Sequence, residues 1–167
     1  TKGNAVDTQW SRRAITGEII KPRYLWQDAS GEILPVFVAD AALGAGRDHE
    51  TVTRLGIGRG RRSVSRVIEW LRNTGEKVAL LTNARQWRLI HAGADYDAWC
   101  EWDIDLWFEE GAPSLQVIAL RQLLSRNALK RRSTEETSPL VSAIQASRKG
   151  QAELSSALGE RVRLAVE

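Results

Sequence analysis

One stretch of this sequence decides the fold, and it reads KVALLTNARQWRLI from Lys77 to Ile90. Two short apolar runs, 78–81 and 87–91, flank a polar Thr-Asn pair. Apolar runs of this length separated by turn residues are typical of a β-hairpin. The stretch therefore predicts two neighbouring strands inside a compact domain that mixes helices and strands.

The segments around this hairpin predict the rest of one α/β domain. Residues 24–27 and 33–39 form a second hairpin with Gly31 in its turn. The four residues Val64, Val67, Ile68 and Leu71 recur at helical spacing, with Ser63 as a possible cap and Gly75 after the end. Residues 101–108 alternate apolar and acidic side chains, which predicts a strand with one wet face. Helices are expected over 113–124 and from Ser138-Pro139 onward.

The composition indicates a soluble globular chain. It has 167 residues, of which 43% are hydrophobic and 27% charged, and this length suits one medium domain with a helical extension. The single cysteine, Cys100, excludes an intramolecular disulfide framework. No apolar run is long enough to span a bilayer and no signal peptide opens the chain, so we expect a cytoplasmic protein without a membrane partner.

The domain organisation is predicted as an α/β domain over 1–130, a charged linker over 131–138 and a helix over 139–167. An apolar stripe that includes Leu154 and Leu158 continues along this last helix. The sequence contains no methionine at all. We therefore expect the chain to be a piece of a longer polypeptide in which another domain follows the last helix.

Charge is unevenly distributed although the net charge is only +3. Seven arginines lie between Arg47 and Arg72, and seven acids without a base lie between Asp95 and Glu110. A basic patch can mark a surface that faces a polyanion. The alternatives are packing against an acidic surface of another domain and ordinary solvated faces.

The residues themselves offer little catalytic chemistry. The glycine-rich segment 55–62 lacks the spacing of a Walker A or dinucleotide-binding motif. We interpret it as an arginine-rich loop, which either contacts nucleic-acid phosphate or is exposed to solvent without a ligand. His49, His91 and Cys100 share no metal-ligand spacing. Asp103 and Asp105 are expected on the same face of one strand. They could hold a magnesium ion, but the simpler interpretation is a strand face exposed to solvent. Three tryptophans on predicted strands are expected in the core: Trp26, Trp87 and Trp102.

The Thr-Asn hairpin resembles the "LLTNG-x-x-W-R-L" segment of large restriction–modification methylases. Other pieces occur in the order of that family: Pro-Arg-Tyr-Leu-Trp from Pro22, Leu-Pro-Val-Phe-Val from Leu34, and Glu-Trp-Asp-Ile-Asp-Leu from Glu101. From about Lys21 to Glu167 the chain is similar to the N-terminal region of type IIG-like restriction–modification enzymes and of BREX- or DISARM-type adenine-specific DNA methylases. The resemblance implies bacterial antiviral defence and double-stranded DNA as a partner.

The resemblance also implies a restriction-endonuclease-like (PD-(D/E)xK-like) core, in which an Asp and a Glu-x-Lys on the first hairpin bind magnesium and activate water. Here Arg23 and Val38-Ala39-Asp40 stand at those places, and neither arginine nor valine can ligate a cation. We therefore predict a nuclease-like fold with no catalytic or metal-binding residues of its own. No motif for S-adenosylmethionine occurs in these residues, so we expect the parent chain to bind that cofactor outside this segment. The parent chain would also bind Mg²⁺ if it has an active nuclease.

Three hypotheses follow. The first is a catalytically silent domain whose arginines contact DNA phosphate: Arg59, Arg61, Arg62, Arg66 and Arg85. For Arg85, a salt bridge to the acidic segment is an equal alternative. The second is an active Mg²⁺-dependent endonuclease with a rearranged acid set, in which Asp40, Asp28 or Glu76 with Lys77 would be the members; Glu18, another acid that could be considered, does not sit at the right point of the hairpin. The third is a scaffold that packs on the methyltransferase domain of the parent chain or on a partner subunit.

Overall fold

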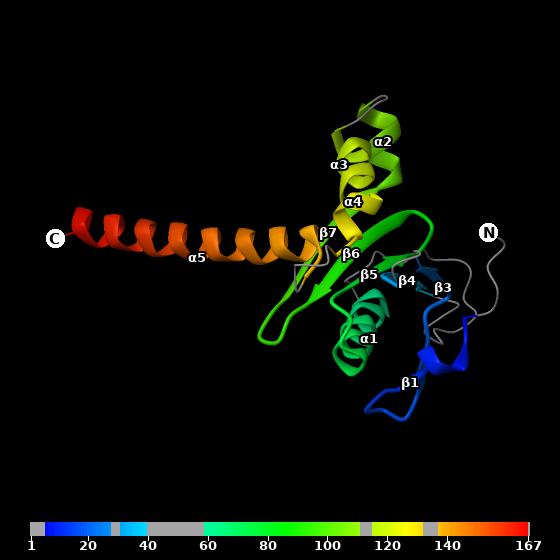
Figure 1. Ribbon diagram of the computed structural model, residues 1–167. Coiled ribbons are helices and arrows are strands. Elements are labelled where there is room, and N and C mark those ends of the chain that lie inside the picture. The colour runs from blue at the N-terminus through cyan, green and yellow to red at the C-terminus, as the bar shows by residue number, and fades with distance from the viewer. Residues whose placement is uncertain (1–5, 28–30, 40–58, 111–114, 132–136, 167) are drawn as a thin grey trace.

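The computed structural model describes residues 6–27, 31–39, 59–110, 115–131 and 137–166. Its centre is a five-stranded mixed sheet in the order β3-β4-β5-β6-β7 (Figure 1). The strands are β3 (Tyr24–Gln27), β4 (Ile33–Val38), β5 (Val78–Thr82), β6 (Gln86–Ala92) and β7 (Asp97–Asp103). The short 3-10 helix η1 (Thr8–Trp10) and a separate two-stranded sheet of β1 (Arg12–Arg13) and β2 (Ile19–Ile20) precede it. The prediction of a mixed sheet with flanking helices is confirmed.

Both predicted hairpins are present. Strands β3 and β4 are antiparallel, with Tyr24 opposite Val36, and β5 and β6 are antiparallel, with Leu80 opposite Leu89. The helix α1 (Arg59–Thr74) connects β4 to β5, which run parallel to each other, as a crossover of this length allows. Every residue of β5 is buried, because this strand is central and has helices over both of its faces.

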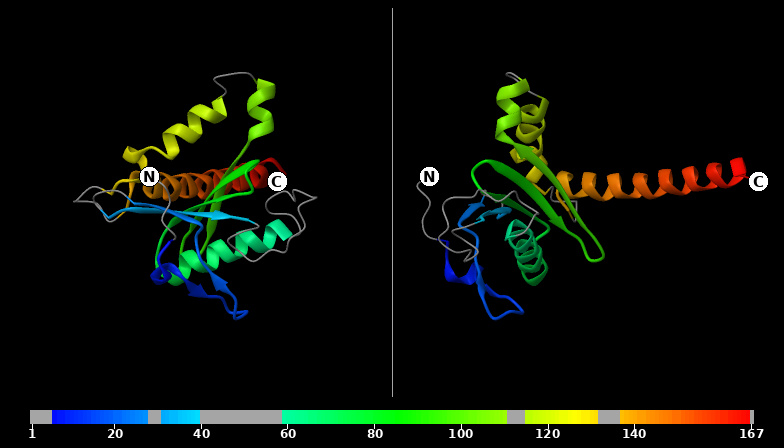
Figure 2. Two further views of the ribbon diagram at one scale, coloured as in Figure 1. Left: turned by 90° about the vertical axis from the view of Figure 1, so that its right-hand side faces the viewer. Right: turned by 180° about the vertical axis from the view of Figure 1, so that it is seen from behind.

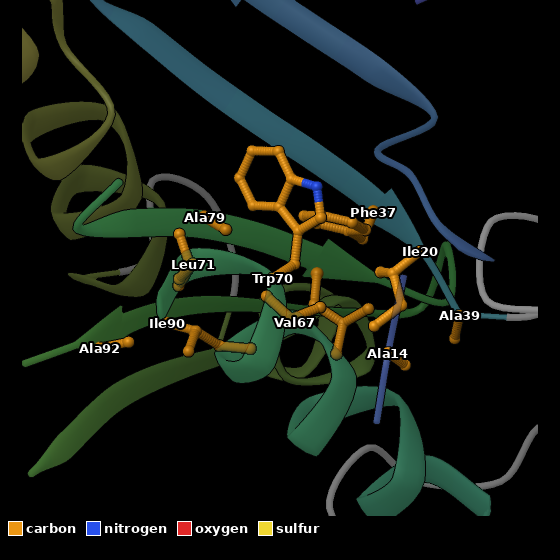
Figure 3. Close-up of a cluster of buried hydrophobic side chains, with 11 residues drawn as sticks. Ala14, Ile20, Phe37, Ala39, Val67, Trp70, Leu71, Ala79, Ile90 and Ala92 are labelled. Carbon is orange, nitrogen blue, oxygen red and sulfur yellow. The ribbon is translucent and has the colours of Figure 1, made fainter. Parts of the chain in front are cut away.

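Helix α1 covers one face of the sheet through the apolar stripe read from the sequence. Val67 and Leu71 are buried, and Val64 and Ile68 pack on the same cluster. Trp70 is fully buried there, with its ring edge-on to Phe37 at 5.4 Å between centroids (Figure 3). The Trp70 indole N–H donates to the Trp10 carbonyl at 2.8 Å, so this large side chain is both packed and hydrogen-bonded.

The other face of the sheet carries α3 (Leu115–Leu123), α4 (Arg126–Leu129) and α5 (Pro139–Val166). Leu129, Leu140 and Val141 are buried against β4–β7. Ser138 caps α5 as expected, since its hydroxyl accepts from the Val141 N–H at 3.4 Å. Beyond these first turns α5 extends away from the sheet (Figure 2). None of the described helices combines the length and the apolar character needed to cross a membrane.

The predicted strand over 101–108 is wrong in its second half. Strand β7 ends at Asp103, and α2 (Ile104–Glu110) begins immediately after it. The Asp103 carboxylate accepts from the Asp105 N–H at 3.0 Å, and such a bond satisfies a free N–H at the start of a helix. Asp103 and Asp105 therefore do not share a strand face.

Three smaller expectations also need correction. Helix α1 begins at Arg59 rather than at a Ser63 cap, so Ser63 lies inside the helix, where it is buried. Residues 59–62, read as part of a loop, form the first turn of α1, while most of that predicted loop lies outside the described residues. Trp26 is exposed because it lies on the edge strand β3, whereas Trp102 is buried as predicted and Trp87 is partly buried.

Candidate nucleic-acid interface

The Thr-Asn motif shapes the turn between β5 and β6. The Asn83 side-chain oxygen accepts from the N–H groups of Arg85 at 3.1 Å and Gln86 at 2.7 Å. The Thr82 hydroxyl donates to the Gln86 carbonyl at 2.8 Å and accepts from the Ala84 N–H at 3.0 Å. Ala84 has a φ of 72°, a left-handed conformation that favours glycine. Ala84 is therefore a position where glycine would be less strained.

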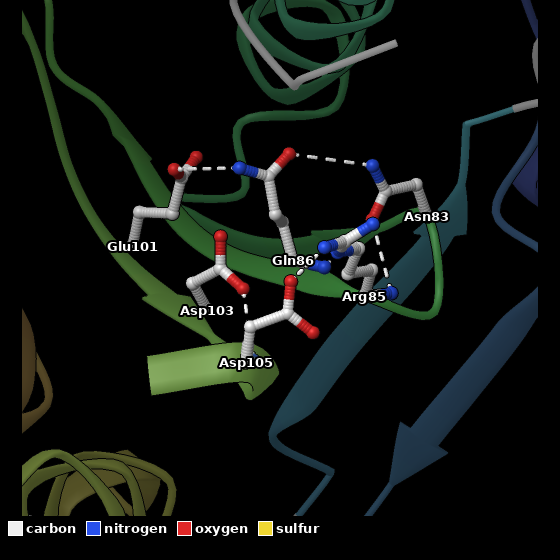
Figure 4. Close-up of polar contacts among 6 residues, drawn as sticks. All are labelled: Asn83, Arg85, Gln86, Glu101, Asp103 and Asp105. Carbon is white, nitrogen blue, oxygen red and sulfur yellow. Dashed lines mark hydrogen bonds and ion pairs between the residues drawn. The ribbon is translucent and has the colours of Figure 1, made fainter. Parts of the chain in front are cut away.

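Polar side chains that follow the turn form hydrogen bonds between β6 and β7 (Figure 4). The Gln86 amide donates to Glu101 at 3.3 Å, and the Arg88 Nε donates to the same carboxylate at 2.8 Å. The Arg88 guanidinium also lies over the Trp99 ring, 4.1 Å from its centroid. Both Arg88 and Glu101 are largely buried, so this network joins the two strands instead of presenting free charge to a ligand.

The arginines proposed for phosphate contact occupy different environments. Arg59, Arg61 and Arg62 lie in the first turn of α1, which contains no acid. Arg62 is exposed and pairs with Glu18 at 2.7 Å. Arg66 pairs with the same carboxylate, but its side chain is only 7% exposed, which leaves little of it for a phosphate.

Arg85 lies at the β5–β6 turn and forms the salt bridge with Asp105 that was the alternative to a phosphate contact. More than half of its side chain is nevertheless exposed. An exposed ion pair of this kind contributes little to stability and can be exchanged for a phosphate.

The relocated nuclease residues do not form one group in the described part of the chain. Glu76 and Lys77 directly precede β5, beside the start of β4. Asp28 and Asp40 lie outside the described residues, and Ala39 hydrogen-bonds Thr82 at the other end of β5. Glu18 forms salt bridges with Arg62 and Arg66 of α1. No set of three or more Asp, Glu, His or Cys side chains within the described ranges is arranged to hold a metal ion.

Glu76 nevertheless has an unusual environment. It lines a cavity of about 330 Å³ with Glu32, Lys77 and Arg131. Burial and the nearby Glu32 carboxylate raise the pKa of Glu76, while Arg131 and Lys77 oppose the rise. Glu32 pairs with Arg131 at 3.2 Å. This arrangement brings two carboxylates together at one end of the sheet.

Sequence reasoning missed a second polar group, on the α5 face of the sheet. His91 was treated as an isolated histidine, but its ring lies 5.4 Å from that of Tyr96, and Arg148 of α5 lies 4.0 Å above the Tyr96 ring. Burial, and then Lys77, lower the pKa of His91, while Asp97 opposes the fall. The alternation of β6 could have placed His91 on one face with Leu89, but nothing in the sequence brings Arg148 to it.

Comparisons with protein-family models, with curated proteins and with solved structures give no match for this chain. The family resemblance read from the hairpin motif therefore stays a hypothesis.

Proposed function

We propose that this chain is a nuclease-like domain of a restriction–modification adenine-specific DNA methylase, catalytically silent by itself, which holds duplex DNA for the parent enzyme. The observation that carries the proposal is the start of α1. Three arginines, Arg59, Arg61 and Arg62, stand in its first turn without an acid among them. The N-terminus of a helix already bears partial positive charge, so cations there destabilise the helix unless anions lie nearby. Glu18 supplies one such anion to Arg62, and DNA phosphates would supply more.

The arrangement of the strands supports a nuclease-like core. An antiparallel hairpin of β3 and β4, a crossover helix and a parallel β5 form the frame in which the resemblance would place a cleavage site. At the positions of that hairpin where acids are expected, the chain has Arg23 and Val38. A domain with such a frame and without the metal-binding side chains would hold DNA without cutting it.

A salt titration of duplex binding tests this proposal. We expect the affinity of the chain for a generic duplex to fall steeply with salt, because each phosphate contact releases counterions. Replacing the three arginines together (Arg59→Ala, Arg61→Ala and Arg62→Ala) should reduce the slope of log K against log[salt] by about 2–3. The control variant carries Arg161→Ala and Arg163→Ala on the distant part of α5 and should keep the slope.

A second candidate function is a scaffold that packs on the methyltransferase domain or a partner subunit. Large apolar side chains are exposed on the outer helices: Leu106 and Phe108 on α2, Leu115 and Ile118 on α3, and Leu154 and Leu158 on α5. Exposed apolar side chains of this size are available to a partner domain or subunit. Weak duplex binding that is insensitive to the triple arginine replacement would contradict DNA holding and favour the scaffold.

A further inference from the structure

Two cavities meet on the α5 face of the sheet. One, of about 500 Å³, lies between β6–β7 and the start of α5, and the other, of about 510 Å³, lies at the β6–β7 turn. Tyr96 and Arg148 line both of them, so the cavities adjoin at the stacked pair that these two side chains form. Small-molecule sites in proteins have volumes of this order.

The two cavities differ in chemistry. The first is lined mainly by apolar side chains, which include Leu89, Leu123, Leu140 and Ile144. Its polar and charged lining comes from Asp97 of β7 and from Ser147, Arg148 and Gln151 of α5. The second is lined by Lys77, Arg148 and Lys149, against the single carboxylate of Asp95. A cavity with an excess of cations attracts an anionic group. One molecule that fills both would therefore combine a largely apolar body with a negative charge.

His91 provides an independent sign that the second cavity binds something. Its side chain lines that cavity and is only 1% exposed. Among the described residues neither of its ring nitrogens has a hydrogen-bond partner, and the same is true of the buried Tyr96 hydroxyl. Buried polar groups are almost always hydrogen-bonded, and one without a partner is unfavourable. Because these polar atoms have almost no exposed surface, a ligand with polar atoms would satisfy them only after a small shift of the surrounding side chains.

We propose that the two cavities form one binding site for a nucleoside phosphate. The base and ribose lie in the first cavity, where Asp97, Ser147 and Gln151 can meet their polar edges, a role that an acyl chain would not fill. The phosphate lies among the cations of the second cavity, and Arg148 bridges the two parts through its stack on Tyr96. This inference does not depend on DNA binding by α1, because it uses the opposite face of the sheet.

Isothermal titration calorimetry of the whole chain tests the site. The probes are adenosine, guanosine, cytidine and uridine monophosphates, the corresponding nucleosides, and inorganic phosphate. We expect at least one monophosphate to bind, and to bind at least about tenfold more tightly than its nucleoside or phosphate alone. No binding of any monophosphate up to about 10 mM would overturn the proposal. Inorganic phosphate that binds as tightly as the monophosphate would overturn it too.

Paired charge reversals locate the binding. Arg148→Glu should weaken binding of the monophosphate at least about tenfold, because it reverses the cation that lines both cavities. The matched control is Arg161→Glu, an exposed arginine further along α5, which should change the affinity less than about twofold. Lys149→Glu serves as a second reversal if Arg148→Glu does not fold. Equal affinities in the reversal and control variants would contradict the site.

Discussion

The two faces of the central sheet are built differently. On the α1 face, Trp70, Phe37 and Leu71 are completely buried, and the buried guanidinium of Arg66 is matched by Glu18. The α5 face also has a buried apolar cluster, around Leu80 and Leu89, but two cavities lie beside it. The difference suggests that the α1 face stabilises the fold, whereas the α5 face has room for a ligand or a partner.

The largest expected effect tests how closed the α1 face is. Trp70→Ala should lower the free energy of unfolding by about 3–5 kcal/mol, because it removes a fully buried ring and its hydrogen bond. Trp99→Ala, which removes an exposed ring, should cost less than about 1 kcal/mol. Urea unfolding followed by circular dichroism measures both values. Similar losses for the two variants would remove the contrast between a closed core and an open surface.

A smaller effect is expected from the ion pairs of Glu18. Glu18→Gln should lower the free energy of unfolding by about 1–3 kcal/mol, since it leaves the nearly buried Arg66 guanidinium without its counter-charge. Glu153→Gln is the matched control because Glu153 forms an exposed ion pair with Lys149 on α5, where the loss should stay below about 0.5 kcal/mol. The comparison would fail if thermal or urea unfolding gave Glu18→Gln no larger an effect than Glu153→Gln.

On the α5 face, the reactivity of Cys100 reports its burial. Burial raises the pKa of the Cys100 thiol to about 11, although a backbone hydrogen bond from Leu89 opposes the rise. At pH 8 this lowers the thiolate fraction about a hundredfold, and the higher intrinsic nucleophilicity of the thiolate recovers about tenfold. A disulfide reagent should therefore react about tenfold more slowly with the folded chain than with the urea-unfolded chain. Equal rates would show a thiol that is not shielded by its surroundings.

The smallest effect concerns the turn of the β5–β6 hairpin, whose strands contribute side chains to both faces of the sheet. Ala84→Gly should raise the free energy of unfolding by about 0.5–1 kcal/mol, because the left-handed backbone at Ala84 is strained for any residue with a Cβ. Ala98→Gly in β7 should instead lower it by about 0.5–1 kcal/mol, since glycine weakens a strand. Thermal unfolding of the two variants distinguishes the signs. A loss of stability in Ala84→Gly would contradict the turn geometry.

Local patterns made much of the fold predictable. The hairpin β5–β6, the stripe of α1 and the Ser138 cap all depend on residues close together in the sequence. The end of β7 was not predictable, because Ile104 to Phe108 alternate as a strand would, and the Asp103 bond to Asp105 outweighs that alternation. Tertiary context decides such ambiguous segments.

The candidate sites were less accessible to sequence reasoning than the fold. Glu18 reaches Arg62 across 44 positions of the chain, and Arg148 reaches Tyr96 from a different helix. Periodicity carries no information on contacts of this kind. The arginines of α1 could be read as a basic cluster, but their place in a helical turn rather than a loop came only from the structure.

The central proposal is that this chain holds DNA without cutting it. Nicking of supercoiled plasmid by the chain in the presence of Mg²⁺ tests that claim most directly, with Glu76→Gln and Lys77→Ala variants beside it. We predict no nicking above the background of the protein-free reaction, with or without Mg²⁺. Nicking that requires Mg²⁺ and disappears in Glu76→Gln or Lys77→Ala would contradict the account and assign the chain an active endonuclease site.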